Sequence, residues 1–450
     1  MKIAFIGGGY VGLVSSVCFS DLGNPVTCIE NNPLKFNALN DGRIPFYEPE
    51  LTEKLVQVTD ACRLKIAPKI TMEIFESDII ILAVGTPMSE TGEANLDYLF
   101  SAVETIIDLS LNKSEHASIV LTTKSTVPVG TGKRIKNMID NAGLAHQISV
   151  ASNPEFLREG SAVYDFFHPD RIIIGCDNDD VFVKFKQLYK GLHKDTRPIS
   201  HVSLETAELA KYASNTFLAT KISFINELAI LCDKVGADIK QTAKLMGMDG
   251  RIGKYFLNPS PGYGGSCFPK DTHALKFIGE QHHVDLKVVS AAINANNHQI
   301  HYCFEQIKDI FAGTIEGKTV TILGTSFKPN TDDVRESASH KLIDLLLTVT
   351  NIQIQVTDPK ALENTKRHYG DQINYYPSAY EAADNSDLII LMTEWNAYRS
   401  LNLNRLKSSM HGNNFIDFRL IYSYEELEAA NFNAYILGKQ TFKKELISQS

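Results

Sequence analysis

The chain opens with a short apolar run and a glycine-rich turn, Lys2-Ile3-Ala4-Phe5-Ile6-Gly7-Gly8-Gly9-Tyr10-Val11-Gly12. The apolar run predicts a buried strand, and residues 11–22 predict a helix directly after the turn. A second apolar run at 25–29 predicts another strand, which ends on the acid Glu30. Strand, glycine turn, helix, strand and terminal acid together predict a βαβ unit of the dinucleotide-binding type.

The spacing Gly7-x-Gly9-x-x-Gly12 has a physical meaning in this context. Glycines permit a tight turn and a close approach of the backbone, so the helix N-terminus can meet a pyrophosphate. Glu30 lies eighteen residues beyond Gly12. A carboxylate there accepts hydrogen bonds from a ribose diol and repels a 2′-phosphate, which favours NAD over NADP. The alternative is a structural turn that binds no nucleotide.

Further apolar runs in the first half predict strands at residues 77–87, 117–122 and 147–152. Strands that alternate with helices predict an α/β fold with a parallel, doubly wound sheet. The same order of runs returns near the C-terminus, at residues 319–324, 353–358 and 386–392. We therefore predict two Rossmann-like units. The second lacks the full fingerprint, because Thr-Ser-Phe-Lys follows Gly324, and we expect it to bind another nucleotide.

A helical region is predicted between these units. Residues 203–235 contain no Gly or Pro and stop at Gly236, a suitable C-cap. They predict one helix of about 50 Å, and residues 284–311 predict a second long helix. We expect three domains: a Rossmann-like NAD-binding domain at 1–200, a central helical domain at 201–312 with the dimer interface and the cysteine loop, and a second Rossmann-like domain at 313–450.

The composition excludes several classes of protein. At 450 residues the chain is too long for one core, and its 44% hydrophobic and 22% charged residues are ordinary for a soluble protein. The net charge of −9 argues against non-specific nucleic-acid binding. No apolar run could span a bilayer, and the glycine turn interrupts what could be a signal peptide. We therefore expect a cytoplasmic protein with no membrane or nucleic-acid partner.

The seven cysteines are scattered, odd in number and without a C-x-x-C pair. This pattern argues against a disulfide framework and a structural zinc site, so we predict no metal. Six cysteines are interpreted as small buried hydrophobes. Cys267 differs, because it lies in the glycine-rich stretch 261–269 and is followed by Lys270 and Asp271. Glycines leave amides accessible to anions and neighbouring cations favour a reactive thiolate; the alternative is a buried, inert thiol.

A nucleophilic thiol and a hydride acceptor in one protein indicate a specific reaction. The thiol can hold an aldehyde as a thiohemiacetal, which gives up a second hydride as a thioester forms. Such a protein oxidises an alcohol past the aldehyde, whereas an ordinary alcohol dehydrogenase needs no such cysteine.

Other polar residues stand at strand ends or on an apolar helix face. Lys211 and Asn215 lie one helical turn apart at the head of an apolar stripe. They are candidates to bind a substrate oxygen, or else a snorkelling Lys and a satisfied Asn. Glu155 and Glu159 follow a predicted strand, where open α/β sheets bind ligands. They suit proton transfer or hydroxyl binding, with surface solvation as the alternative.

Two more loops follow strand ends. Residues 124–130, which include Thr126, admit the same two interpretations. Residues 327–337 lie at the equivalent point of the second unit and carry Lys328 and Arg335. These two cations suit phosphates, and the alternative is a solvated charged loop.

Together these stretches resemble the UDP-glucose/GDP-mannose dehydrogenase family of nucleotide-sugar 6-dehydrogenases, through nearly the whole chain. The motifs that carry the resemblance are the fingerprint with Tyr10-Val11, Gly85-Thr86-Pro87, Ser125-Thr126-Val127-Pro128, residues 153–160, Lys211-Tyr-Ala-Ser-Asn215, Arg251-Ile252-Gly253, residues 264–271 and residues 327–337. One departure is Glu30, where many members carry Asp; the longer acid can still reach a ribose.

The resemblance implies a reaction and a set of roles. Members oxidise the sugar C6 alcohol to a carboxylate with two NAD and one water, which here implies UDP-glucose to UDP-glucuronate in nucleotide-sugar and polysaccharide biosynthesis. Cys267 would be the nucleophile that forms the thiohemiacetal and thioester. The other catalytic residues would be Lys211 and Asn215 for the oxyanion, and Asp271, Glu155 and Thr126 for water and protons.

The resemblance also implies ligand contacts. NAD would be contacted by Gly7, Gly9, Tyr10, Val11, Gly12, Glu30, Lys35, Thr86, Thr126, Glu159, Lys270 and Arg335. The nucleotide sugar would be contacted by Glu155, Phe156, Leu157, Arg158, Lys211, Asn215, Arg251, Phe256, Leu257, Asn258, Pro259, Ser260, Tyr263, Gly264 and Lys328, with 313–450 as the UDP-sugar-binding domain. Arg251 would reach the sugar nucleotide from the other subunit, which implies a homodimer.

Three other functions stay open. A GDP-mannose dehydrogenase would use the same mechanism; Phe268 and the run that starts at Lys328 favour UDP-glucose, on resemblance only. A two-electron hydroxyacid dehydrogenase would release a carbonyl product and would need neither Cys267 nor a second α/β unit. A non-catalytic NAD-binding or sensor protein would need no thiol.

Overall fold

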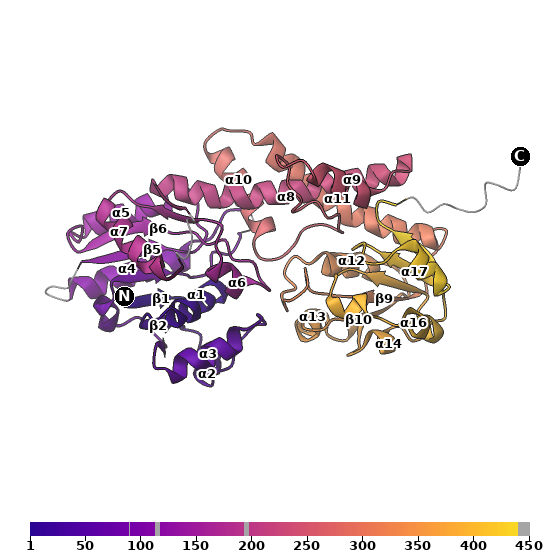
Figure 1. Ribbon diagram of the computed structural model, residues 1–450, viewed down its shortest axis with the longest axis horizontal. Coiled ribbons are helices and arrows are strands. Elements are labelled where there is room, and N and C mark those ends of the chain that lie inside the picture. Colours follow the sequence, from indigo (N-terminus) through magenta and orange to yellow (C-terminus); the bar gives the residue numbers. More distant parts are fainter. Residues whose placement is uncertain (90, 113–117, 193–197, 440–450) are drawn as a thin grey trace, which may run out of the picture. The chain divides into compact units, whose positions relative to one another are not determined.

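The structure is a computed structural model that describes residues 1–89, 91–112, 118–192 and 198–439. The chain forms two compact units (Figure 1). The first contains Met1–Ser214 and His273–Val284, and the second contains Asn215–Thr272 and the chain from Asp285 onward. The predicted division into 1–200, 201–312 and 313–450 stays a prediction.

An eight-stranded sheet forms the centre of the first unit, in the order β3-β2-β1-β4-β5-β6-β7-β8. The strands are β1 (Ile3–Ile6), β2 (Val26–Ile29), β3 (Leu64–Ala67), β4 (Ile79–Leu82), β5 (Ile119–Thr123), β6 (Ile148–Ser152), β7 (Ile172–Gly175) and β8 (Ile199–Val202). The described pairs are parallel except β6 with β7, where Ser152 opposes Gly175. The predicted parallel strands are confirmed; residue 117 of one of them lies outside the described residues.

Helices cover both faces of this sheet. The helices are α1 (Tyr10–Asp21), α2 (Pro33–Asn40), α3 (Leu51–Asp60), α4 (Asp97–Leu111), α5 (Thr131–Asn141), α6 (Ala162–Phe167) and α7 (Asp179–Leu188), with 3₁₀ turns at Met72–Glu76 and Tyr189–Leu192. One core joins α1, α3, α6 and α7 to residues such as Phe5, and the other joins α4 and α5 to residues such as Ile6. Neighbouring residues of β1 thus enter opposite cores, which explains its continuous apolar sequence.

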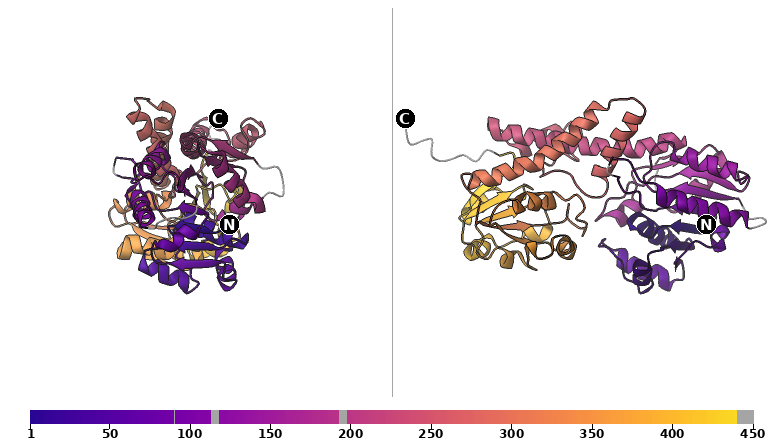
Figure 2. Two further views of the ribbon diagram at one scale, coloured as in Figure 1. Left: turned by 90° about the vertical axis from the view of Figure 1, so that its left-hand side faces the viewer. Right: turned by 180° about the vertical axis from the view of Figure 1, so that it is seen from behind.

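The second unit contains a six-stranded parallel sheet in the order β11-β10-β9-β12-β13-β14. Figure 2 shows this part of the chain from behind, in orange and yellow. Its strands are β9 (Thr319–Leu323), β10 (Gln353–Thr357), β11 (Asn374–Tyr375), β12 (Leu388–Leu391), β13 (Asn414–Asp417) and β14 (Asn433–Ile436). The order repeats that of β3-β2-β1-β4-β5-β6 in the first unit, so the predicted second Rossmann-like unit is confirmed.

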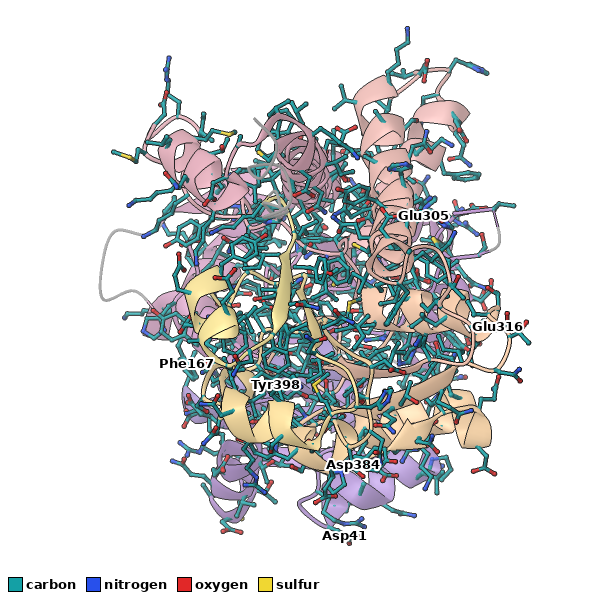
Figure 3. All side chains as sticks on the ribbon, turned by 90° about the vertical axis from the view of Figure 1, so that its right-hand side faces the viewer. Asp41, Phe167, Glu305, Glu316, Asp384 and Tyr398 are labelled. Carbon is teal, nitrogen blue, oxygen red and sulfur yellow. The ribbon has the colours of Figure 1, made fainter. Side chains whose placement is uncertain are left out.

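Short helices surround this second sheet. They are α12 (Ala338–Leu347), α13 (Leu362–Tyr369), α14 (Ala379–Ala382), α15 (Asn396–Arg399), α16 (Leu403–Ser409) and α17 (Tyr424–Ala429), with a 3₁₀ turn at Gly370–Gln372. Tyr398 of α15 is buried in this layer (Figure 3), and its hydroxyl donates to the carbonyl of Thr357, 3.0 Å away. This bond ties α15 to the C-terminal end of β10.

Four further helices follow β8 and precede β9 in the sequence: α8 (Leu204–Val235), α9 (Ile239–Gly247), α10 (Phe268–Gln281) and α11 (Lys287–Ile310). The predicted helix at 203–235 is confirmed as α8, and Gly236 follows it with φ +75°. The helix predicted at 284–311 is confirmed as α11, although it begins three residues later. No helix in the described ranges has the length and apolar character to cross a membrane.

The cysteines differ in one respect from their interpretation. Cys62 is exposed, in the turn between α3 and β3, where it adopts a left-handed φ of +54°. Cys18, Cys28, Cys176, Cys232 and Cys303 are buried as expected, and Cys267 is half-buried. The interpretation of six buried cysteines is therefore wrong for Cys62, because this residue lies in an exposed turn.

The buried side chain of His340 makes the free energy of unfolding depend on pH. Its buried ring packs against His368 and Tyr369, with centroids 5.1 and 5.0 Å away. Burial and the charge of His368 lower the pKa of His340 to about 4. Folding therefore favours the neutral ring. The contribution of His340 to the free energy of unfolding is fully present above about pH 6.5, the ordinary pKa of histidine, and is lost as the pH falls through about 4, its pKa in the folded state.

As the pH falls from about 6.5 to about 4, we expect the free energy of unfolding of the wild type to decrease relative to that of His340→Gln, by at most about 3 kcal/mol. Urea unfolding at a series of pH values measures this difference, with His298→Gln, an exposed position on α11, as the control. Parallel stability curves for the wild type and His340→Gln would contradict the expectation.

Candidate active site

The glycine turn joins β1 to α1 and has the geometry that the fingerprint predicts. Gly7 adopts φ +107°, and its amide donates to the carbonyl of Ile29, 2.9 Å away. A Cβ on Gly12 would lie 1.8 Å from the Gly7 carbonyl oxygen, so no side chain fits there. A Cβ on Gly9 would meet nothing within 4 Å. This open space at the N-terminus of α1 fits the pyrophosphate of a dinucleotide.

Glu30 lies against the same turn. It is buried at the end of β2, and its Oε2 would lie 3.1 Å from a Cβ on Gly8. Its Oε1 accepts a hydrogen bond from the amide of Asn32 at 2.8 Å. The Asn32 side chain in turn caps α2, where it accepts a bond from the amide of Lys35 at 3.2 Å. The acid predicted to hold the ribose is therefore fixed beside the turn predicted to hold the pyrophosphate.

The loops after β4 and β5 are joined by direct hydrogen bonds. The Thr86 hydroxyl donates to the carbonyl of Thr126 at 2.9 Å, and the Ser125 hydroxyl donates to the carbonyl of Val84 at 2.7 Å. Two predicted cofactor residues from separate motifs are thus brought together.

A buried ion pair joins the loop after β6 to helix α8. The Lys211 Nζ donates to the backbone oxygen of Glu155 at 2.6 Å and to its Oε1 at 3.1 Å. The Leu157 amide donates to the other carboxylate oxygen at 2.5 Å. The Phe156 ring lies below the guanidinium of Arg171, 3.8 Å from the ring centroid. Because breaking a buried pair is costly, each partner fixes the position of the other.

Lys124 is the first residue of the selected loop 124–130, although the sequence analysis gave this lysine no role of its own. It is buried at the end of β5, and its Nζ donates to Asn153 Oδ1 at 3.3 Å and to the Tyr189 hydroxyl at 3.4 Å. Burial lowers the pKa of Lys124 to about 8; the charge of Glu155 opposes this shift and the charge of Lys211 adds to it. The signal was available, because a lysine that directly follows an apolar strand is unusual.

The residues after Glu155 are also held in place. The Arg158 guanidinium pairs with Asp165 across 2.6 Å, and the Arg158 amide donates to the same carboxylate at 2.9 Å. Glu159 acts on Tyr10, because its charge is one of those that raise the pKa of the Tyr10 hydroxyl. The Tyr10 hydroxyl and the Gly160 amide, next to Glu159, both donate to the same oxygen of Glu48, which brings the two segments together.

In the second unit, Cys267 directly precedes α10. Its carbonyl accepts a bond from the amide of Asp271 at 2.8 Å, and the Ser266 hydroxyl lies 3.6 Å from its Sγ. A helix N-terminus favours the thiolate form of a cysteine. The Asp271 carboxylate, 1% exposed, accepts bonds from Asn215 Nδ2 at 2.6 Å and from Lys270 Nζ at 2.5 Å. The residues predicted for the reaction in this unit thus form one hydrogen-bonded group.

The cysteine loop packs directly on the loop after β9. The Gly265 amide donates to the carbonyl of Arg335 at 2.9 Å, and Gly265 adopts φ +80° with its α-carbon against the Phe327 ring. A Cβ on Gly264 would lie 2.1 Å from the Glu336 carbonyl oxygen, so this contact requires glycine. The Arg335 guanidinium pairs with Asp333 across 2.7 Å. The structure therefore brings two predicted motifs together.

Three buried amide side chains hold the predicted substrate loop 256–264, and the sequence analysis missed all three. Asn226 Oδ1 accepts from the Ser260 amide at 2.8 Å, and Gln299 Nε2 donates to the Ser260 carbonyl at 2.9 Å. Asn296 Oδ1 accepts from the Tyr263 amide at 2.7 Å. The signal was a polar amide within each apolar helix face, which needs a buried partner.

The predicted residues divide between the two units. Thr126, Glu155 and Lys211 lie in the first, whereas Asn215, Cys267, Asp271 and Lys328 lie in the second. Arg251 lies beside Asp249, 2.5 Å away, with its side chain 90% exposed, and its predicted role stays a prediction. Among the described residues, no group of His, Cys, Asp and Glu could hold a metal ion.

The two glycines predict opposite results when replaced by alanine. Gly12→Ala should lower the free energy of unfolding by about 2 to 3 kcal/mol, because the new methyl group would overlap the Gly7 carbonyl. Gly9→Ala should leave stability unchanged and raise the Kd for NAD at least about tenfold, because the methyl group would occupy the open space. Urea unfolding measures the free energy of unfolding of each variant, and calorimetric titration measures its Kd for NAD. Unchanged NAD binding by Gly9→Ala would contradict the assignment of the glycine turn as the pyrophosphate site.

Comparison with known proteins gives consistent matches along the chain. Three domains of the UDP-glucose/GDP-mannose dehydrogenase family match in order: the NAD binding domain at residues 1–193, the central domain at 205–298 and the UDP binding domain at 321–424. The chain is 39% identical to the UDP-glucose 6-dehydrogenase of Rhizobium meliloti (strain 1021), over 98% of this chain and 100% of that protein.

Two further matches agree. The UDP-glucose 6-dehydrogenase of Rickettsia conorii (strain ATCC VR-613 / Malish 7) is 40% identical, over 98% of this chain and 100% of that protein. The solved structure of a UDP-glucose dehydrogenase from the hyperthermophilic archaeon Pyrobaculum islandicum matches with a TM-score of 0.89 and 34% identity, over 98% of both chains. The chain therefore belongs to the UDP-glucose/GDP-mannose dehydrogenase family and carries its NAD binding domain.

Proposed function

We propose that the protein is a UDP-glucose 6-dehydrogenase, which oxidises UDP-glucose to UDP-glucuronate with two NAD and one water. The observation that carries this proposal is Cys267, half-buried at the N-terminus of α10 beside the buried pair of Asp271 and Asn215, which the half-buried Lys270 also joins. The names of the full-length relatives support the choice of substrate. A two-electron dehydrogenase or a binding protein needs no thiol in this setting.

The glycine turn, Glu30, Thr86 and Thr126 would hold NAD, which supplies the hydride acceptor for both oxidations. The turn offers free amides and the dipole of α1 to the pyrophosphate, and Glu30 offers a carboxylate to the ribose diol. The chemistry of the sugar then depends on polar groups of the chain.

Lys211 and Glu155 handle charge and protons when the C6 alcohol is first oxidised. The alcohol loses a proton from oxygen and a hydride from carbon. The Lys211 ammonium stabilises the oxygen as its negative charge develops, a contribution of about 3 kcal/mol for one such donor. The nearby Glu155 carboxylate, directly or through a water, accepts the proton.

Cys267 then retains the aldehyde. Its sulfur forms a bond to C6 and the aldehyde oxygen takes a proton, which gives a thiohemiacetal. Loss of a second hydride and the hydroxyl proton gives a thioester. Water next attacks C6, the carbon–sulfur bond breaks and the thiol is regenerated, so the water oxygen ends in the carboxylate. Asn215 binds the oxyanion, and Asp271 holds Asn215 and orients the water.

The UDP group would be bound by the loop 256–264 and Lys328. The amide side chains of Asn226, Asn296 and Gln299 hold that loop without using its remaining backbone groups. Parallel assays with UDP-glucose and GDP-mannose test the base preference, and faster turnover of GDP-mannose would overturn the assignment. We further expect the enzyme to act in the cytoplasm, in nucleotide-sugar and polysaccharide biosynthesis.

Helix α8 supports the proposal of a homodimer. Phe217, Phe224 and Leu231 recur at seven-residue spacing on α8, and they are 65%, 49% and 52% exposed. Three large apolar side chains in one row on a helix are typical of a helix–helix interface. In such a dimer, Arg251 would complete the substrate site of the other subunit.

Introducing charge into this row should therefore separate the subunits. The variant Phe217→Glu/Leu231→Glu is expected to sediment as a monomer and to lose at least about tenfold in kcat/KM, because each site lacks Arg251 from the other subunit. Analytical ultracentrifugation measures the mass, and Val183→Glu, at an exposed apolar position on α7, is the control. A dimer that persists in the double variant would count against this interface.

Replacing the thiol tests the covalent mechanism. In Cys267→Ser, formation of UDP-glucuronate should fall by a factor on the order of 10³ or more, because a serine hydroxyl is a far weaker nucleophile. NAD binding should be unchanged, since the glycine turn is untouched. Product formation is measured by chromatography, with Cys62→Ser, an exposed cysteine, as the control. Wild-type turnover by Cys267→Ser would refute the mechanism.

A further inference from the structure

We propose that Glu48 is a positioning residue of the cofactor site, which locks the glycine turn to the loop after β6. It lies in the segment between α2 and α3, outside every motif selected from the sequence, and is 4% exposed. The inference rests on the proposed roles of Tyr10 and Glu159 in NAD binding.

The Glu48 carboxylate receives three hydrogen bonds from two distant segments. Its Oε2 accepts bonds from the Tyr10 hydroxyl and from the Gly160 amide, the latter at 2.6 Å. Its Oε1 accepts a bond from the Ala162 amide at 2.7 Å. A buried carboxylate must be compensated by donors of this kind, because its desolvation is otherwise costly. Both oxygens are used, so the carboxylate fixes both segments at once.

Tyr10 is held at the end of the glycine turn. It is the first residue of α1, directly after Gly9, and its ring packs on Phe46 with centroids 4.9 Å apart. Burial, then the charge of Glu48 and its hydrogen bond, and also the charge of Glu159, raise the pKa of the Tyr10 hydroxyl far above its usual value. The hydroxyl therefore stays protonated and acts as a donor to Glu48 throughout the physiological range.

The second segment begins at Glu159. The Gly160 amide, which donates to Glu48, is part of the peptide group that joins Glu159 to Gly160. The Glu48 carboxylate therefore also orients the backbone of Glu159. Glu48 thus positions Tyr10 and Glu159, which are both proposed to contact NAD, and is not itself proposed to contact the nucleotide. The geometry predicts that Glu48 acts on NAD affinity, whereas a purely structural residue would act on stability alone.

The variant Glu48→Gln tests this role. Its NH₂ group would face the Ala162 amide in place of Oε1, or the Tyr10 hydroxyl and the Gly160 amide in place of Oε2, so at least one of the three bonds is lost. We expect the Kd for NAD, measured by calorimetry, to rise about tenfold. The KM for UDP-glucose should change by less than about twofold. Glu50→Gln, an exposed acid two residues away, is the matched control and should bind NAD like the wild type.

A second variant keeps the test valid if Glu48→Gln does not fold. Tyr10→Phe removes one hydroxyl and leaves the ring on Phe46, and it should also raise the Kd for NAD. The double variant should raise the Kd by less than the product of the two single effects, because both changes disturb the same hydrogen-bonded group around Glu48. Multiplicative effects would overturn the proposed link between Tyr10 and Glu48.

The outcomes separate this inference from the proposed function. If the wild type does not bind NAD, the proposed function fails. If the wild type binds NAD and Glu48→Gln has a lower unfolding midpoint but the wild-type Kd, Glu48 is only a structural residue and the inference fails. A raised Kd with a wild-type result for Glu50→Gln supports it.

Discussion

The buried carboxylate of Asp271 determines the geometry of the cysteine loop. It lies in the first turn of α10, and its bond to Asn215 links that turn to α8, while its bond to Lys270 lies within the turn. Gly265 and Gly264 complete the arrangement, because their missing side chains let the loop approach Arg335 and Glu336. The thiol is thus positioned by one carboxylate and two glycines, and the proposed chemistry depends on that position.

Buried carboxylates have the same structural role elsewhere in the chain. Glu208 of α8 accepts the amides of Gly130 and Gly132 at 2.6 and 2.7 Å, which fixes the start of α5. Burial raises the pKa of Glu208 to about 7, although these two bonds oppose the shift. Asp358, at the end of β10, accepts the amides of Thr325 and Ser326 at 2.8 and 3.0 Å. Loops at the strand ends lack a backbone ladder, and these acids supply the acceptors instead.

Local sequence patterns predicted the buried strands, the glycine turn and the long helix. The apolar runs of β1 and β4, the glycine turn and the uninterrupted α8 were all recognisable, because burial on both faces and helix length leave a continuous signal. Strands β3, β7, β8, β11, β13 and β14 were missed. Each has at most four residues, and β8 and β14 are also partly exposed. Glu48 was missed as well, because its bond to Gly160 spans 112 residues and no local pattern marks such a partner.

The proposed reaction depends on one property of Cys267, that its thiol retains the aldehyde until a second oxidation occurs. The most direct measurement is the number of NADH formed per UDP-glucose, with the sugar limiting and NAD in excess. Four-electron oxidation predicts two NADH per sugar, with UDP-glucuronate as the product. One NADH per sugar, with a carbonyl product released, would contradict this mechanism.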